Sequence, residues 1–171
     1  MLRHEQNRGK GSALRTAFDD LFGRGFDAVL TLDADGQHLA EEIPKLRAGL
    51  VPGIDLVLGS RQALFEGMVL QRRLANRCSA RLISFAAGCR VGDAQTGFRI
   101  YRRRLVEATG FPEPRFEAES AVVVRAARLG FKIAGVPVRL GFVDGRRTSH
   151  YRPVVDSLRI ALAVVRARFV R

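Results

Sequence analysis

Two aspartates, Asp33 and Asp35, directly follow a short apolar segment, residues 26–32. Such a segment is typical of a buried strand, and open α/β sheets bind ligands at the carboxyl ends of their strands. Carboxylates at this spacing can both reach one divalent cation, and their oxygens suit Mg²⁺ or Mn²⁺, which commonly bridge to phosphate. The alternative is a plain loop in which an aspartate caps the next helix.

A glycine-flanked turn, residues 7–12, carries Lys10 ahead of this strand. It is not a Walker A phosphate loop, because His4 stands where that motif needs glycine and Gly11 stands where it needs serine or threonine. The start of a helix nevertheless offers free N–H groups to an anion, and Ser12 is a candidate N-cap for that helix. Anion binding and a purely structural turn are both compatible with this segment.

Further polar segments contain arginines, whose planar guanidinium group suits phosphate. Residues 93–99 end in Arg99, two residues after a glycine, and Arg61 follows an apolar strand at residues 55–59. Each segment is equally compatible with a surface turn. Residues 144–152 form a basic loop that could clamp a diphosphate or an anionic lipid headgroup, or could simply be solvated.

One carboxylate falls on the apolar side of a helix predicted over residues 117–129. On a helical wheel Glu119 points with Val122 and Ala126, whereas Glu117 falls on the polar side. A carboxylate on an apolar face is costly unless it is paired or used. Either Glu119 serves a site, or the helix begins only after it and the residue lies in a cap.

The composition places these residues in a globular protein. The chain has 171 residues, 47% of them hydrophobic, which is enough for one domain with a core. Its net charge is +12, no apolar run approaches the ~20 residues that cross a bilayer, and its two cysteines cannot form a disulfide framework. The first residues lack the apolar core of a signal peptide. We therefore expect a cytoplasmic protein rather than a secreted or membrane-spanning one.

Strands and helices alternate in the predicted pattern, which indicates an α/β fold with mostly parallel strands. Strands are expected at residues 26–32, 55–59, 98–101 and 132–140, and helices at residues 12–22, 40–49, 70–87, 117–129 and 153–169. In the helix at 70–87, apolar residues that include Leu82 and Phe85 share one face. The last helix has an apolar side with Leu158 and Leu162 and carries arginines elsewhere, so it could lie on a membrane or pack on the sheet.

Taken in order, these motifs resemble the family 2 glycosyltransferases, in particular the polyprenyl-phosphate branch with the dolichyl-phosphate mannose and glucose synthases. The matching segments are NRGKGSALR at 7–15, LTLDADGQH at 30–38, LVLGSR at 56–61, DAQTGFR at 93–99, FEAE at 116–119 and GVPV at 135–138. The resemblance implies a Rossmann-like nucleotide-diphospho-sugar transferase sheet of the GT-A type with flanking helices. Residues 1–171 would form a single, N-terminally truncated glycosyltransferase domain that ends in a basic amphipathic helix at about 153–169.

The resemblance implies a metal-dependent, inverting transfer of a sugar from a nucleotide-diphospho-sugar to a polyprenyl phosphate at the cytoplasmic membrane face. The Mg²⁺ or Mn²⁺ ion would be held by Asp33, Asp35 and Gln37. The donor diphosphate would contact Lys10, Asp33, Arg147 and His150. The acceptor phosphate would face Arg61, Arg72, Arg73 and Arg99. The carboxylates at the reacting centre would be Asp35, Glu117 and Glu119.

The chain departs from the family at its start, because the opening Pro-x-x-Asn-Glu and Asp-Asp-Gly-Ser motifs do not occur. The missing units would contact the nucleotide base and ribose, and without them the strand at residues 26–32 would keep an exposed edge. The true start lies upstream, the missing part is a separate chain, or the chain is a decayed fragment that is inactive alone. Two rival functions are transfer to a saccharide or another lipid, and a non-catalytic basic domain that binds polyanions or anionic membrane. No nucleic-acid motif is recognisable.

Overall fold

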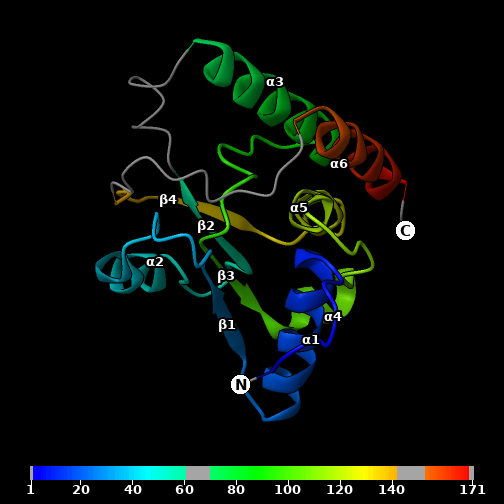
Figure 1. Cartoon of the computed structure of the whole chain (residues 1–171). Coiled ribbons are helices and arrows are strands. Elements are labelled where there is room, and N and C mark those ends of the chain that lie inside the picture. Colours follow the sequence, from blue (N-terminus) through cyan, green and yellow to red (C-terminus); the bar gives the residue numbers. More distant parts are fainter. Residues whose placement is uncertain (1, 61–69, 142–152, 170–171) are drawn as a thin grey trace.

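A mixed four-stranded sheet forms the centre of the molecule in the computed structural model, which describes residues 2–60, 70–141 and 153–169 (Figure 1). Its strands are β1 (Ala28–Thr31), β2 (Leu56–Ser60), β3 (Arg99–Arg102) and β4 (Ile133–Pro137), in the order β1-β3-β2-β4. β3 runs antiparallel to both of its neighbours, while β2 and β4 are parallel. The predicted α/β class is thus confirmed, with β3 as the strand that breaks the parallel pattern.

The helices also follow the sequence pattern closely. They are α1 (Lys10–Gly23), the 3₁₀ helix η1 (Ala40–Glu42), α2 (Ile43–Ala48), α3 (Leu70–Ala87), α4 (Arg103–Thr109), α5 (Glu117–Arg128) and α6 (Pro153–Arg168). The short helix α4 was not expected from the sequence. The prediction that Ser12 caps α1 is wrong, because the helix already begins at Lys10 with Gly9 at the cap position.

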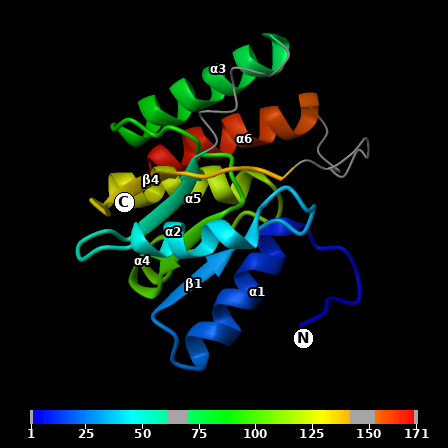
Figure 2. The same ribbon diagram turned by 90° about the vertical axis from the view of Figure 1, so that its left-hand side faces the viewer.

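The helices form layers on the two faces of the sheet. Neighbouring residues of a strand point to opposite faces, so Leu56 and Tyr101 join the larger core with α1, α4 and α5, whereas Val57 and Ile100 join a smaller one under α2. Both views place α3 and α6 side by side, with α5 between them and the sheet (Figures 1 and 2). The sheet therefore carries one helix layer on one face and two on the other.

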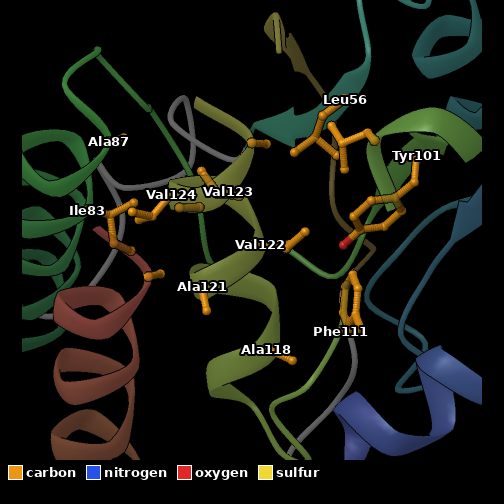
Figure 3. Close-up of a cluster of buried hydrophobic side chains, with 14 of the residues drawn as sticks. Leu56, Ile83, Ala87, Tyr101, Phe111, Ala118, Ala121, Val122, Val123 and Val124 are labelled. Atoms are coloured by element: carbon orange, nitrogen blue, oxygen red, sulfur yellow. The ribbon is translucent and has the colours of Figure 1, made fainter. Parts of the chain in front are cut away.

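Helix α5 is the centre of the larger core (Figure 3). Every residue from Glu117 to Ala126 is buried, including both glutamates of its first turn. Part of its predicted polar side is enclosed as well, because Arg125 is buried and lies 2.6 Å from Glu113. Since the helix begins at Glu117, the alternative that Glu119 precedes the helix is wrong.

The described apolar side chains of the predicted α3 row, Leu82 and Phe85, face outward, and so do those of the predicted α6 row that include Leu158 and Leu162. Helix α6 packs through Ile160, Ala163, Val164 and Ala167, while its larger side chains remain exposed. On α3, Phe85 is 73% exposed although the neighbouring Ile83 is fully buried. The predicted faces exist, but these helices use small and β-branched residues for internal packing. Within the described part of the chain, no helix is long and apolar enough to cross a membrane.

An ion pair fastens the segment before α2 to the end of β4, and it provides a pH test of the fold. The Arg139 Nε donates to Glu42 Oε1 at 2.5 Å. This hydrogen bond outweighs the burial of the carboxyl group and holds the pKa of Glu42 below its ordinary value of 4.5. A lowered pKa means that the stabilisation is complete above pH 4.5 and is lost as the pH falls through the pKa of the folded state.

We therefore expect Arg139→Met to lower the urea midpoint of unfolding at pH 7, with a difference from the unsubstituted chain that shrinks below about pH 4. The measurement is urea unfolding at a series of pH values. Arg128→Met removes an exposed arginine of α5 and serves as the matched control. A difference that persists undiminished at pH 3 would contradict this role for the ion pair.

Candidate active site

The ammonium group of Lys10 joins two carboxylates that come from distant parts of the sequence. Lys10 Nζ lies 2.6 Å from Asp33 Oδ1 and 2.6 Å from Glu119 Oε2. Lys10 begins α1, Asp33 follows the end of β1, and Glu119 lies in the first turn of α5. The structure thus brings three predicted site residues together at the carboxyl end of a strand.

Glycines allow the start of α1 to approach the segment before α5. A Cβ atom at Gly9 would overlap the Pro114 carbonyl oxygen, and one at Gly11 would overlap that of Glu113. Gly9 also has a φ of 91°, a conformation that other residues rarely adopt. The Ser12 N–H donates to Pro114 O at 3.1 Å. This packing favours the structural interpretation of the glycine-rich turn, whose effect is to place Lys10.

A third glycine, Gly97, packs directly against the Asp33 carboxylate. A Cβ atom at position 97 would overlap all three atoms of that carboxylate. The same loop is tied to β1, because Thr31 Oγ1 donates to the Gly97 carbonyl at 3.1 Å. The segment at 93–99 is therefore packed against Asp33 and is not a surface turn.

The Asp33 carboxylate is held in its ionised form. Its partial burial opposes ionisation, but the neighbouring His38 and the Lys10 ammonium outweigh that effect and keep the pKa of Asp33 well below its usual range. The His38 Nε2 lies 3.8 Å from Asp33 Oδ2, and the His38 ring packs near Phe98. Its other nitrogen, Nδ1, is buried without a hydrogen-bond partner in the structure. His38 belongs to this site although the sequence analysis gave it no role.

Arg99 lies inside the protein and does not face a surface where an acceptor phosphate would approach. The alternation of β3 points it, like Tyr101, toward α5, where it is 0% exposed. Its guanidinium donates to the carbonyls of Thr96, Glu119 and Ala94 at 2.6–2.7 Å. Its Nε also lies 3.6 Å from Glu119 Oε1. The geometry thus differs from the expected phosphate contact: Arg99 fixes the 93–99 loop and the start of α5.

The other predicted residues fall into three groups. Asp35 Oδ1 accepts a 3.0 Å hydrogen bond from the Gln37 N–H, which folds the turn after β1. Glu117 is buried and its Oε2 has no hydrogen-bond partner in the structure. The positions outside the described residues are Arg61, Arg147 and His150, and Arg72 and Arg73 lie in α3 where side chains are not described.

Among the described residues, no three His, Cys, Asp or Glu side chains converge as a ready metal cage. The donor set after β1 still fits Mg²⁺ or Mn²⁺, because Asp33 and Asp35 supply hard oxygen atoms one residue apart. Mg²⁺ is commonly bound through one or two carboxylates, with water and substrate phosphates as the other ligands. The metal prediction is therefore compatible with this site when a phosphorylated ligand is bound.

Comparison with known proteins decides the family. Residues 1–110 match the model of Glycosyl transferase family 2. The chain belongs to this family. Relatives include a UDP-N-acetylglucosamine–dolichyl-phosphate N-acetylglucosaminyltransferase of Methanococcus voltae, 28% identical over 84% of this chain and 59% of the relative. Another is the polyprenol monophosphomannose synthase of Mycolicibacterium smegmatis, 26% identical over 81% and 54%. These relatives confirm the resemblance to the polyprenyl-phosphate branch of the family.

The fold also matches solved glycosyltransferases. The glucosyl-3-phosphoglycerate synthase of Mycobacterium tuberculosis superimposes with a TM-score of 0.60 at 22% identity, over 95% of this chain and 56% of that protein. A structure of the same enzyme that holds Mn²⁺, UDP and phosphoglyceric acid gives a TM-score of 0.59. These matches confirm the predicted GT-A type of fold. The chain spans 54% to 61% of the length of the first four curated relatives it matches.

Because Gly97 contacts Asp33, a methyl group added at position 97 should lower the free energy of unfolding. Gly97→Ala would push the Asp33 carboxylate away from Lys10, and we expect it to lower the free energy of unfolding by about 1–3 kcal/mol. Gly135→Ala is the matched control, because a Cβ atom there meets nothing within 4 Å. Equal stability of the two variants in urea unfolding would contradict the close packing at Gly97.

Removal of the shared cation should also destabilise the protein. Lys10→Met leaves Asp33 and Glu119 as neighbouring carboxylates without the ammonium between them. We expect a loss of about 1.5–3 kcal/mol at pH 7, the range for hydrogen bonds to charged groups. Lys132→Met, at an exposed lysine before β4, should change the free energy of unfolding far less. Equal effects of the two substitutions in urea unfolding would show that the bridge contributes nothing.

Proposed function

We propose that this protein transfers a sugar from a nucleotide-diphospho-sugar to a polyprenyl phosphate, with inversion, at the cytoplasmic face of a membrane. The observation that carries the proposal is the Lys10–Asp33–Glu119 cluster at the end of β1 in a family 2 fold. The relatives named above act on dolichyl or polyprenol phosphates by their names. Since the chain spans little more than half of their length, donor and acceptor remain proposals for it.

Asp33, Asp35 and Gln37 would hold the metal ion, which would stabilise the negative charge of the leaving diphosphate as a Lewis acid. The depressed pKa of Asp33 keeps this ligand ionised at any physiological pH. Lys10 adds a positive charge beside it, which attracts the diphosphate before reaction and offsets its charge afterwards. Arg147 and His150 are proposed as further contacts of the donor.

The acceptor phosphate needs little help from a general base, because its oxygen is already anionic at pH 7. This oxygen would attack the anomeric carbon of the sugar, and the bond from that carbon to the donor diphosphate would break, so that the nucleoside diphosphate leaves with the electron pair. Arg61, Arg72 and Arg73 are the proposed contacts of the acceptor phosphate. The buried Arg99 would instead position Glu119 and the loop under Asp33.

The two glutamates of α5 have different surroundings and therefore different proposed roles. Glu119 already contacts Lys10 and lies near Arg99, so it acts as the fixed counter-charge of the site. Glu117 Oε2 and Glu119 Oε1 are both buried without a hydrogen-bond partner in the structure, but Glu119 Oε1 has the Arg99 guanidinium 3.6 Å away. An unpaired buried oxygen is costly, and a sugar hydroxyl group could satisfy it. We propose Glu117 as the residue that contacts the transferred sugar.

The proposal predicts metal-dependent nucleotide binding that requires Asp35. Calorimetric titration with UDP- and GDP-sugars should give micromolar affinity in Mn²⁺ and none in EDTA, and Asp35→Ala should weaken binding at least tenfold. Asp20→Ala removes a half-buried carboxylate of α1 that pairs with Arg24, and it should leave binding unchanged. In the same samples, a short-chain polyprenyl phosphate should become glycosylated, as followed by mass spectrometry. A folded chain that binds neither sugar nucleotide would refute donor binding by this chain.

A further inference from the structure

We propose that Lys10 makes metal binding depend on the donor diphosphate, because its ammonium group and the divalent cation compete for the Asp33 carboxylate. In this exchange the ammonium group leaves Asp33 for the diphosphate, and the carboxylate then becomes available to the cation. The inference rests on the proposed function and adds to it a coupling between two ligands of the same site. Its central step can be tested with the metal ion alone.

Both oxygens of the Asp33 carboxylate already face a nitrogen donor. Lys10 Nζ lies 2.6 Å from Oδ1, and His38 Nε2 lies 3.8 Å from Oδ2. Gly97 packs against the same carboxylate from another side. A divalent cation that shared Oδ1 with the ammonium group would lie close to it, and like charges repel strongly in a partly enclosed site. Lys10 therefore weakens metal binding for as long as it contacts Asp33.

A second contact allows the ammonium group to leave Asp33 without leaving the site. Lys10 Nζ also lies 2.6 Å from Glu119 Oε2. The Glu119 side chain is only 6% exposed, and the Arg99 guanidinium lies 3.6 Å from its other oxygen. The Asp33 side chain, in contrast, is 34% exposed. Glu119 thus keeps the lysine in the site, and the contact with Asp33 is the one that a ligand from solvent can replace.

A diphosphate has the chemistry that can draw the ammonium group from Asp33. Lysine binds phosphate as a point charge on a flexible stem, and the Lys10 side chain is 22% exposed. The backbone at the start of α1 is fixed, because the Ser12 N–H donates to Pro114 O at 3.1 Å. The side chain can therefore turn toward a phosphate while the helix stays in place. Metal and diphosphate would then strengthen the binding of each other by the same factor.

A purely structural role for Lys10 predicts the opposite effect on metal binding. If the ammonium group only held Asp33 in position, its removal would leave the carboxylate less ordered and metal binding weaker. If the ammonium group competes with the cation, its removal makes metal binding stronger. The two interpretations therefore differ in the sign of one measurement.

The first test is titration of the whole chain with Mn²⁺ in the absence of nucleotide, followed by the electron paramagnetic resonance signal of free Mn²⁺. We expect Lys10→Met to strengthen Mn²⁺ binding about tenfold or more, within the usual range of coupling between two ligands. Lys10→Arg keeps the positive charge and should keep Mn²⁺ binding weak. Lys132→Met, at an exposed lysine, is the matched control and should leave the affinity unchanged. The proposal is overturned if Lys10→Met binds Mn²⁺ no more tightly than the unsubstituted chain.

Circular dichroism verifies the fold of each variant, and it also covers the case in which Lys10→Met does not fold by itself. Mn²⁺ should then restore the fold, because a cation that binds only the folded chain stabilises it. A Lys10→Met chain that stays unfolded in millimolar Mn²⁺ would count against the exchange.

The second test measures the coupling by equilibrium dialysis of labelled UDP at fixed concentrations of free Mn²⁺. Saturating Mn²⁺ should tighten UDP binding to the unsubstituted chain about tenfold or more, and Lys10→Met should reduce this factor several-fold. An equal factor in both chains would overturn the coupling through Lys10. Failure of the proposed function has a different signature: the unsubstituted chain would bind no UDP- or GDP-sugar in Mn²⁺, whereas the sign of the Lys10→Met effect on Mn²⁺ binding is measured without nucleotide.

Discussion

The positive charge of Lys10 has to lie between Asp33 and Glu119, and much of the fold serves this requirement. Two carboxylates in a partly enclosed site repel each other and favour protonation unless a cation lies close to both. Gly9 and Gly11 let α1 begin against the segment before α5, which brings the ammonium group to both carboxylates. Gly97 clears the space that Asp33 occupies. These three glycines therefore allow the ammonium group of Lys10 to lie between the two carboxylates.

Arg99 is the second cation of this arrangement, and its hydrogen bonds hold the loop under Asp33 against the first turn of α5. A fully buried guanidinium group is tolerated only when its donors are satisfied, and here three of its nitrogens donate to three carbonyls. Those carbonyls belong to the loop under Asp33 and to Glu119 itself. Lys10 lies 2.6 Å from Glu119 Oε2, and Arg99 lies 3.6 Å from Glu119 Oε1. Glu119 Oε1 and Glu117 Oε2 are both buried without a hydrogen-bond partner in the structure.

The sequence alone predicted much of this fold, because its strands and helices have strong periodic patterns. The bounds of α3 were predicted to the residue, and Asp33 and Glu119 were recognised as chemically unusual for their positions. Contacts between distant segments were not predictable in this way. Nothing in the pattern of β3 shows that Arg99 is enclosed by backbone carbonyls, or that His38 lies beside Asp33. Helix α4 is short and directly follows β3, so its seven residues give no separate periodic signal.

The two outer helices show why periodicity identifies faces without saying which face is inside. Both sides of α6 are apolar, and the choice between them depends on how closely α5 approaches. Small residues such as Ala163 and Ala167 allow close contact between helix backbones, whereas Leu158 and Phe169 would hold the helices apart. The larger side chains are therefore left outside, where each forgoes about 1.5–3 kcal/mol of burial free energy. A row of such residues gains that free energy only when a partner covers it.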